Sequence, residues 1–446
     1  MRVNKIEITH DDFQEVIAGR QGDNVLPEHL PNRITKNERA SPNSSTAFVS
    51  LAQRPKVIFS IRVINRLGVL LDRFGATSGA LTEAAVLKDA RKLCNLDDFG
   101  PGRFRKPLQL LIGDYEQDPH LTYLGKLVAR KMLARIVANR MQVHRDLQQH
   151  PEILSEKIDS PLFVVGLPRS GTTLMYNLLA QDPASRPLMF WETYAPSRPA
   201  GNPDPRIKAA EGVIKGLYRA IPEIQQVHEF DAQGPDECTG LLLNTFATPY
   251  FRGRLPGYRA WLFNVGQDEI DQAYVEYRQQ LQLIQTQGSA GRWILKSPSH
   301  LFGLASLLKT FPDAGVVYLH RNPARCVPSL CSLTNALDTI SYRSIDKHEI
   351  GRRTLEIVKQ LVKGARRAKD SEHGNRIYEV QYDDLIADPV RTVAGVYERF
   401  GVRVNPEFET RLTSYVTENP QHKHGVHSYS LEEFGLSEAK LQALES

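Results

Sequence analysis

The chain lacks several features that would mark it as a membrane, secreted or metal-dependent protein. Its 446 residues contain no apolar run near the roughly 20 residues of a membrane-spanning helix. Residues 1–7 contain no apolar core of the kind found in a signal peptide. Only four cysteines occur, and none forms a C-x-x-C pair or another metal-binding spacing. We therefore expect a cytoplasmic protein with free thiols, no transmembrane segment and no bound metal.

The chain also has no large excess of positive or negative charge. The formal net charge is +5, and charged residues make up 24% of the chain beside 41% hydrophobic residues. These fractions are those of an ordinary globular protein with a sizeable core. A positive excess this small does not indicate nucleic-acid binding, and we expect no nucleic-acid partner. It does suit small polyanionic ligands.

The most informative stretch of the chain is residues 161–174. Its apolar residues at 162–165 predict a buried strand. A turn bounded by glycines follows at 166–171, and the apolar spacing after the turn is helical. A turn between a strand and a helix presents backbone N–H groups, and the helix N-terminus favours negative charge. The pattern therefore predicts a phosphate-binding turn.

This turn departs from the nucleotide-binding pattern G-x-x-x-x-G-K-[ST] at one position. Gly166, Gly171 and Thr173 match the pattern. The lysine position is occupied by Thr172, and the cation of the turn is Arg169 instead. The missing lysine argues against nucleoside triphosphate hydrolysis, in which it reaches the β- and γ-phosphates. A tight turn that binds no ligand is the alternative interpretation.

Further along the chain, strands and helices alternate. Strands are predicted at 292–295, 315–319 and 376–382, with helical stretches between them, and a run with strand character leads to Trp191 and Glu192. Alternation of this kind predicts a parallel sheet with helices on both faces. In such sheets the ligand site lies at the carboxyl ends of the strands, where the phosphate-binding turn also lies.

The chain divides into three parts by pattern. Residues 1–79 form a polar arm and a basic amphipathic helix at 57–74, which could dock onto the body, onto a second copy in a homodimer or onto a membrane surface. Residues 80–157 are expected to form a helical layer. Residues 158–446 form the α/β domain, in which a helical insertion at 201–290 would cap the site.

Two further expectations concern exposure to solvent. Residues 334–350 lie between two helical patterns and are expected to form a loop or lid. Four arginines recur along the predicted helix at 121–150, and a charge stripe of this kind is usually a solvated face. They are Arg130, Arg135, Arg140 and Arg145.

The sequence P-R-S-G-T-T at 168–173 resembles the 5′-phosphosulfate loop of the sulfotransferases that use 3′-phosphoadenosine-5′-phosphosulfate (PAPS). It is most similar to the branch that includes many bacterial enzymes and the tyrosylprotein sulfotransferases, and the likeness extends over residues 80–440. The resemblance implies a P-loop-like, three-layer α/β fold with a central parallel sheet, here with an N-terminal helical layer and a helical cap. It also implies that the 5′-phosphosulfate binds Arg169, Ser170, Gly171, Thr172 and Thr173.

The resemblance further implies that Arg321 and Ser329, eight residues apart after a predicted strand, hold the 3′-phosphate. A dianionic phosphate suits a guanidinium fork together with a hydroxyl. Tyr382, in a Tyr-Asp-Asp-Leu stretch, resembles the tyrosine that lies near the adenine. Lys423 belongs to a basic tail loop that would close over the 3′-phosphate, and a neighbouring histidine could take its place. The alternatives are a surface ion pair for Arg321, core packing for Tyr382 and an ordinary surface loop for the tail.

Sulfuryl transfer is an in-line displacement at sulfur, which needs a base for the acceptor's proton and cations for the leaving phosphate. Lys296 resembles the lysine that contacts the bridging oxygen in related enzymes. Two candidates for the base stay open, His228 and Glu192, each of which resembles the base of one group of relatives. Chemistry favours His228, because histidine titrates near neutral pH and a glutamate must first be desolvated, and Glu192 would then orient it or the acceptor. His300 is a lesser candidate.

We therefore expect a PAPS-dependent sulfotransferase whose product is adenosine 3′,5′-bisphosphate (PAP). Its acceptor would be a hydroxyl, or less often an amine, of a small or medium-sized molecule. Aromatic residues in 201–290 favour an apolar or aromatic acceptor body, although any one of them could instead pack in the core. They are Phe230, Phe246, Tyr250, Phe251, Tyr258, Trp261 and Phe263. The other functions considered are a kinase or NTPase, disfavoured by the missing lysine, and a catalytically idle nucleotide-binding scaffold.

Overall fold

The computed structural model describes residues 81–199, 204–222, 224, 230–288, 291–419, 430–442 and 444. The predicted arm and amphipathic helix at 1–79 lie outside these residues, and so does the surface suggested for a homodimer. Two predicted site residues, His228 and Lys423, also lie outside them. Among the helices that are described, none has the length and apolar character that crossing a membrane requires.

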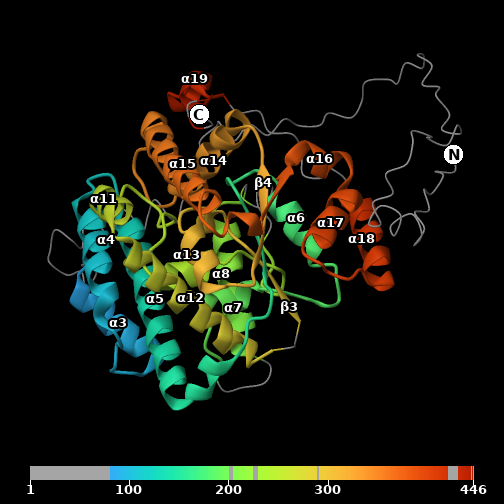
Figure 1. Ribbon diagram of the computed structural model, residues 1–446. Coiled ribbons are helices and arrows are strands. Elements are labelled where there is room, and N and C mark those ends of the chain that lie inside the picture. The colour runs from blue at the N-terminus through green and yellow to red at the C-terminus, as the bar shows by residue number, and fades with distance from the viewer. Residues whose placement is uncertain are drawn as a thin grey trace, which may run out of the picture.

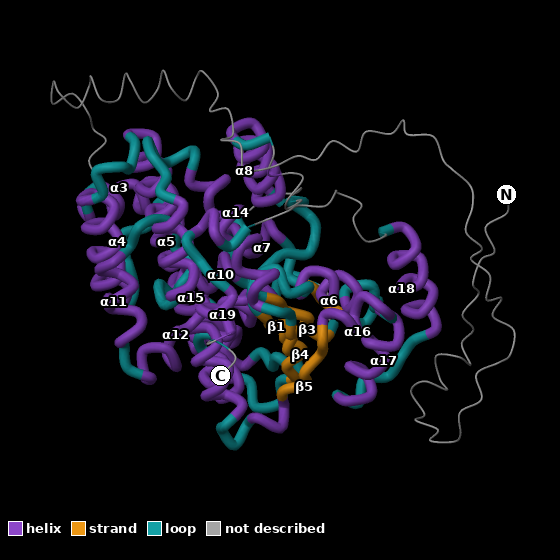
Figure 2. Tube along the Cα trace, turned by 90° about the horizontal axis from the view of Figure 1, so that it is seen from above, coloured by secondary structure: helices purple, strands orange, loops and turns teal. Residues whose placement is uncertain are grey.

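A parallel sheet of five strands has the order β2-β3-β1-β4-β5. In Figure 2 the strands lie between α16, α17 and α18 on one side and the larger group of helices on the other. The strands are β1 (Leu162–Gly166), β2 (Ser185–Pro187), β3 (Arg292–Lys296), β4 (Gly315–His320) and β5 (Ile377–Gln381). Every residue of β1 is buried. An unbroken apolar run is what a central strand covered on both faces requires. The predicted parallel sheet is therefore confirmed.

The two faces of the sheet carry separate hydrophobic clusters. Successive side chains of a strand point to opposite faces, so Leu162 and Val164 pack on one face while Phe163 and Val165 pack on the other. In Figure 1, α6, α17 and α18 stand apart from the larger group of helices. The first face is covered by α6 (Thr172–Leu179), α16 (Tyr382–Ala387), α17 (Pro389–Arg399) and α18 (Pro406–Glu418).

The opposite face carries a thicker helical layer. Side chains as far apart in sequence as Leu133 and Trp293 belong to its one hydrophobic cluster, so the helices of residues 80–157 share a core with the sheet. The α-helices of this layer are α3 (Glu83–Cys94), α4 (Arg105–Gln117), α5 (Tyr123–Gln149), α10 (Thr239–Asn244), α11 (Pro256–Asn264), α12 (Gln267–Gln285), α13 (Leu304–Thr310), α14 (Pro323–Asp338) and α15 (Lys347–Lys369). Short 3₁₀ turns are η1 (Gly102–Phe104), η2 (Pro151–Ser155), η3 (Pro298–Leu301), η4 (Gly374–Arg376) and η5 (Glu432–Phe434).

Local sequence explains where the long helices begin. Thr82 precedes α3, and its hydroxyl accepts a hydrogen bond from the Ala85 N–H at 3.2 Å. Thr122 caps α5 and Asp346 caps α15 in the same way. Each side-chain oxygen satisfies a backbone N–H that has no partner within the first helical turn.

The prediction of a loop or lid at 334–350 is wrong at both ends of that segment, and only residues 339–346 connect the two helices. Helix α14 continues to Asp338 and α15 begins at Lys347. The connection between them is held down, because Tyr342 is buried and pairs with Leu121 as an isolated β-bridge. This segment therefore ties the α/β part of the chain to the N-terminal helices.

The arginines of α5 do not form a solvated face. Arg135 donates a hydrogen bond to the Tyr194 carbonyl at 3.0 Å and stacks on the Tyr194 ring. The side chain of Arg140 is only 11% exposed and pairs with Glu276 of α12 at 2.6 Å. A charge pattern on one helix cannot reveal partners on other helices, and this stripe lies between helices.

The run that leads to Trp191 and Glu192 has strand structure only at β2. It continues into a short helix, α7 (Phe190–Tyr194), which carries both residues. Glu192 starts this helix, because its carboxylate accepts the Met189 N–H at 3.0 Å. The expectation of a strand ending in this pair is therefore wrong.

The helices of the insertion at 201–290 pack in two separate parts of the structure. Helix α8 (Pro205–Ala220) packs on α7, whereas α11 packs on α4 and α12 on α13. The aromatic side chains divide in the same way. Phe246 and Tyr258 are buried in the large hydrophobic cluster, whereas Phe230 packs beside α7 and α8. Only part of the insertion therefore lies near the turn at 166–171.

Candidate active site

The predicted strand–turn–helix is present, with β1 ending at Gly166 and α6 beginning at Thr172. Gly171 precedes the helix with φ +94°, in the left-handed region that glycine tolerates best. Arg169 also has a positive φ, +72°, which is uncommon for a residue with a side chain. Strain of this kind persists only where surrounding contacts hold it, and it is typical of ligand sites.

The inside of the turn is narrow and holds an unsatisfied hydroxyl. A Cβ at Gly166 would lie 2.5 Å from Ser170 Oγ and 2.7 Å from the Leu319 carbonyl oxygen, so the position requires glycine. Ser170 is fully buried, and its Oγ has no hydrogen-bond partner among the described residues. A buried hydroxyl without a partner is costly. A phosphate or sulfate oxygen in the turn would satisfy it, so these residues fit the 5′ end of PAPS.

The residues predicted for the two ends of the nucleotide form one cluster. Arg169 Nε donates to Ser329 Oγ at 3.1 Å, and Arg321 Nη1 donates to the Arg169 carbonyl oxygen at 2.8 Å. The Arg321 guanidinium lies 3.9 Å from the centre of the Tyr382 ring. That ring covers Gly171, where a Cβ would lie 2.8 Å from it. Arg321 therefore supports the strained turn while its own position is fixed by Tyr382.

Lys296 reaches the same edge of the sheet from β3, the strand beside β1. It is 2% exposed, and its ammonium donates to Glu237 Oε1 at 2.7 Å. The same ammonium lies 3.4 Å from Thr173 Oγ1, at the start of α6. A buried cation therefore stands beside the turn at 166–171.

Comparison with known proteins identifies the family to which the chain belongs. A model of the sulfotransferase family matches residues 161–406, more than half of the chain. The chain belongs to this family and is a sulfotransferase. The matched range includes the turn, Lys296, Arg321, Ser329 and Tyr382.

Mycobacterial sulfotransferases are similar over most of their length. The omega-hydroxy-beta-dihydromenaquinone-9 sulfotransferase Stf3 of Mycobacterium tuberculosis is 25% identical over 288 residues, which is 61% of this chain and 70% of the relative. The crystal structure of STF1 from the same species has 29% identity and a TM-score of 0.72, with 82% of this chain and 99% of that chain covered. STF9 of Mycobacterium avium has 28% identity and a TM-score of 0.73, with coverage of 82% and 96%.

These relatives confirm the predicted three-layer, P-loop-like fold and the predicted transfer of a sulfuryl group. Use of PAPS is a general property of sulfotransferases of this kind. A kinase or NTPase function and an idle scaffold are correspondingly disfavoured. The departure noted in the sequence, with Thr172 at the lysine position of an NTPase and Arg169 as the cation of the turn, agrees with this family.

In the sulfotransferase, Glu192 makes an ion pair rather than facing open solvent. It is 3% exposed, and its Oε1 accepts from Arg186 Nη2 at 2.7 Å. Its other oxygen accepts the Met189 N–H, and the Arg186 guanidinium stacks 3.9 Å from the Trp293 ring centre. Both carboxylate oxygens are thus engaged in holding α7 to the sheet.

Glu192→Gln tests whether this carboxylate is structural. We expect the substitution to lower the free energy of unfolding by about 3 kcal/mol, because it leaves the buried Arg186 without a counter-charge. Thermal unfolding measures the effect. Glu211→Gln is the control, since Glu211 pairs with Lys215 on the exposed side of α8 and its loss should cost only about 0.3 kcal/mol. Unchanged stability with a large loss of turnover would instead support the predicted role of Glu192 as a base.

The predicted histidines differ in accessibility. His228 lies outside the described residues and stays a prediction. His300 is fully buried, in η3, with Nδ1 at 3.0 Å from the Tyr274 hydroxyl. Burial lowers the pKa of His300 to about 3, so it is neutral and closed off from substrate. This sealed position is poorly suited to proton transfer with an acceptor.

Two carboxylates that the sequence analysis did not single out, Asp236 and Glu237, lie beside Lys296. Glu237 pairs with Lys296, and Asp236 lines a small recess at the end of β3. The recess also has an apolar side formed by Phe190 and Phe230, whose ring centres are 6.0 Å apart. The only signal in the sequence was an acidic pair after Gly-Pro, which is far too common to predict a site.

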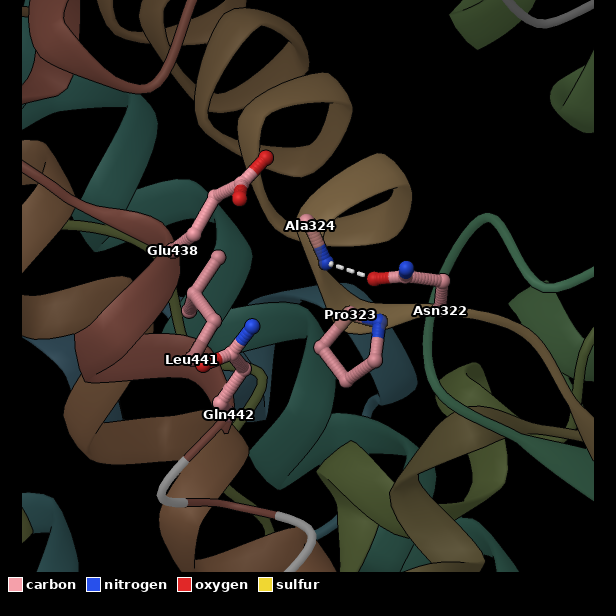
Figure 3. A pocket seen from close by; sticks show the side chains of 6 residues that line it. All are labelled: Asn322, Pro323, Ala324, Glu438, Leu441 and Gln442. Carbon is pink, nitrogen blue, oxygen red and sulfur yellow. Dashed lines mark hydrogen bonds between the residues drawn. The ribbon is translucent and has the colours of Figure 1, made fainter.

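The C-terminal helix α19 (Glu438–Gln442) lies against the start of α14, next to the strand end that carries Arg321. Figure 3 shows a second recess between these helices, with Asn322 and Ala324 on one side and Glu438 on the other. The Ala324 N–H donates to Asn322 Oδ1 at 2.8 Å and starts α14. The residues that line this recess include the Glu438 carboxylate and no basic side chain, so it does not suit a phosphate.

Proposed function

We propose that this sulfotransferase transfers the sulfuryl group of PAPS to a hydroxyl group on a small or medium-sized acceptor with an apolar body. The observation that carries the proposal is the convergence of Arg169, Arg321 and Lys296 at the ends of three neighbouring strands. Three cations at one sheet edge, beside a turn with an unsatisfied buried hydroxyl, suit a ligand with two phosphate groups and a sulfate.

The proposed site residues form two groups, one for the 5′ end of the nucleotide and one for its 3′ end. Arg169 and the rest of the turn, Ser170 to Thr173, would bind the 5′-phosphosulfate. Arg321 and Ser329 would bind the 3′-phosphate, with Tyr382 near the adenine and Lys423 from the tail. Bound PAPS supplies an activated sulfuryl group, and Lys296 would stabilise the charge that develops on the leaving phosphate oxygen.

The acceptor is the less constrained part of the proposal. The recess beside Lys296 has the aromatic pair Phe190 and Phe230 on one side and carboxylates on another. Aromatic rings favour an apolar body, and carboxylates disfavour an anionic one. The name of the mycobacterial relative, an omega-hydroxy-beta-dihydromenaquinone-9 sulfotransferase, supports an alcohol on a lipophilic molecule. The four cysteines are free, which supports the reducing cytoplasm as the compartment.

Two measurements test the proposal. Calorimetry should show that PAP binds at least about 100-fold more tightly than AMP, because charge-assisted hydrogen bonds to the 3′-phosphate are worth about 1.5–3 kcal/mol each. A mass-spectrometric screen of lipophilic alcohols with PAPS should detect products heavier by one SO₃ group. Equal affinity for PAP and AMP would contradict the assignment of the donor site, and products confined to amines would contradict the acceptor class.

A further inference from the structure

The recess beside Lys296 brings a carboxylate to the place where an acceptor would meet the donor. Thr173 and Lys296 line its inner part, and both belong to the proposed phosphosulfate site. Phe190 and Phe230 form its apolar side. Asp236 lies in the same recess and has no part in the donor site described above. A group in this position can contact the reacting end of an acceptor.

Backbone hydrogen bonds fix the segment that carries Asp236. The Asp236 N–H donates to the Leu188 carbonyl at 2.8 Å, and Pro235 forms an isolated antiparallel bridge with Met189. Two residues on, the Cys238 N–H donates to the Lys296 carbonyl at 2.9 Å. The segment is thus bonded both to the chain that follows β2 and to the end of β3. The backbone at Asp236 is therefore fixed before any acceptor binds, which limits the positions that its carboxylate can take and favours proton transfer.

Glu237, Glu192 and His300, the other candidates for a base near the turn, are engaged or sealed off. Glu237 accepts from Lys296 and, through its second oxygen, from the Thr239 hydroxyl at 3.1 Å. Glu192 is engaged with Arg186. His300 is fully buried, as described above. Asp231 also lines the recess, but it is exposed and its carboxylate accepts the Gln233 N–H at 3.0 Å. Of the two described acids that line the recess, Asp236 combines partial burial with freedom from an ion pair.

We propose that Asp236 is the general base of this sulfotransferase, and the proposal rests on the proposed function. The acceptor oxygen forms its bond to sulfur while its proton passes to an Asp236 carboxylate oxygen. The bond between sulfur and the 5′-phosphate oxygen breaks, and its electron pair stays on that phosphate. Lys296 would stabilise the negative charge on the leaving oxygen, and Asp236 would accept the proton of the attacking oxygen. The proton later leaves Asp236 for solvent.

The charges around Asp236 suit this role. Burial raises the pKa of Asp236 to about 7, the Glu237 carboxylate adds to the shift, and the Lys296 ammonium opposes it. The remaining titratable groups that line the recess are Tyr176 of α6, whose pKa is raised by burial, and Asp231 of the same segment. A base that titrates near neutral pH is half ionised there and holds a transferred proton well. Turnover should therefore rise with pH through the pKa of Asp236.

Asp236→Asn tests the proposal by rate. The rate is measured with two acceptors, so the natural substrate is not needed. One is water, for which transfer is followed as the slow release of PAP from PAPS. The other is 4-nitrophenol, which ionises by itself near neutral pH. We expect transfer to water to fall by about 100-fold or more and its rise with pH to disappear. Transfer to 4-nitrophenol should fall much less, because that acceptor needs no base. Asp268→Asn, at an exposed carboxylate of α12, is the matched control and should behave as the parent protein.

An unchanged pH profile of PAPS hydrolysis in Asp236→Asn would overturn the proposal. Equal slowing with both acceptors would also overturn it, since it would show that Asp236 supports the site without taking a proton. His228→Gln is the rival variant: if it abolishes the rise with pH and Asp236→Asn does not, His228 is the base. Thermal unfolding of each variant reports whether it is folded.

Proton uptake on PAP binding gives a readout independent of turnover. The negative 5′-phosphate of PAP, bound near Asp236, raises the pKa of that carboxylate further and makes it take up protons. Calorimetry at neutral pH in buffers of different ionisation enthalpy should show more proton uptake by the parent protein than by Asp236→Asn, with similar affinity for PAP. Identical proton uptake would contradict the proposal. If the parent protein does not bind PAP at all, the proposed function itself fails.

Discussion

Arg321→Ala is expected to weaken PAP binding by at least about 100-fold, because the guanidinium would make more than one charge-assisted hydrogen bond worth about 1.5–3 kcal/mol. The structure adds a second reason. Arg321 donates to the carbonyl of Arg169, whose backbone is in the left-handed region, so its removal also loosens the phosphate-binding turn. Calorimetric titration with PAP measures the effect. AMP binding should weaken as well, although by less.

Two further substitutions make this result specific. Arg325→Ala removes an exposed arginine from the first turn of α14 and should leave PAP affinity unchanged. Arg321→Lys keeps the charge but loses the planar fork and its stacking on the Tyr382 ring, and should give an intermediate loss. If Arg321→Ala bound PAP as tightly as the parent protein, the assignment of the 3′-phosphate to this residue would be wrong.

Lys296→Met is expected to lower kcat by about 100- to 1,000-fold, which is typical for the loss of one group that stabilises transition-state charge. PAP affinity should change far less, in contrast to Arg321→Ala. Methionine has a similar length, so the packing near Tyr176 is kept, and the side chain of Glu237 is 25% exposed and can be hydrated once its partner is gone. Single-turnover kinetics with PAPS and water as acceptor separate the two effects.

The same variant should also shift the pH dependence. Lys296 lowers the pKa of Asp236, so its removal raises that pKa and moves the rise in turnover to higher pH. Lys309→Met, which removes an exposed lysine that pairs with Asp271, is the control and should change neither quantity. A fall in PAP affinity as large as the fall in kcat would mean that Lys296 binds the nucleotide and does not act selectively in the transition state.

Contiguous patterns in the sequence were sufficient to predict the fold and to suggest residues for the donor half of the site. The strand, turn and helix at 161–174 follow one another in the chain, so local spacing contains the information. Lys296 and Arg321 could be added because each follows a buried strand, and parallel strands bring their carboxyl ends to one edge of the sheet. The observed sheet order, with β1 between β3 and β4, places both beside the turn.

Interactions between distant segments could not be predicted in this way. Charge patterns suggested that the arginines of α5 face solvent, but Arg140 pairs with Glu276 on another helix. Glu192 was predicted as a candidate base from its likeness to other enzymes. The structure shows that it pairs with Arg186, whose guanidinium stacks on the Trp293 ring, and the sequence contains no sign of this pair. Burial and pairing depend on which helices pack together, and no local spacing contains that information.

By itself, the sequence determined that a glycine-bounded turn follows a central parallel strand, and it contained enough of the family's motifs to predict a sulfotransferase. Only the tertiary structure decided how the turn is supported and which acid accompanies it. Arg321 holds the Arg169 carbonyl across 152 residues of chain. Asp236 reaches the end of β3 because backbone hydrogen bonds join its segment to Leu188 and Lys296. The physical reason is that a turn is built from consecutive backbone groups, whereas a catalytic pair is built from side chains that only the packed fold brings together.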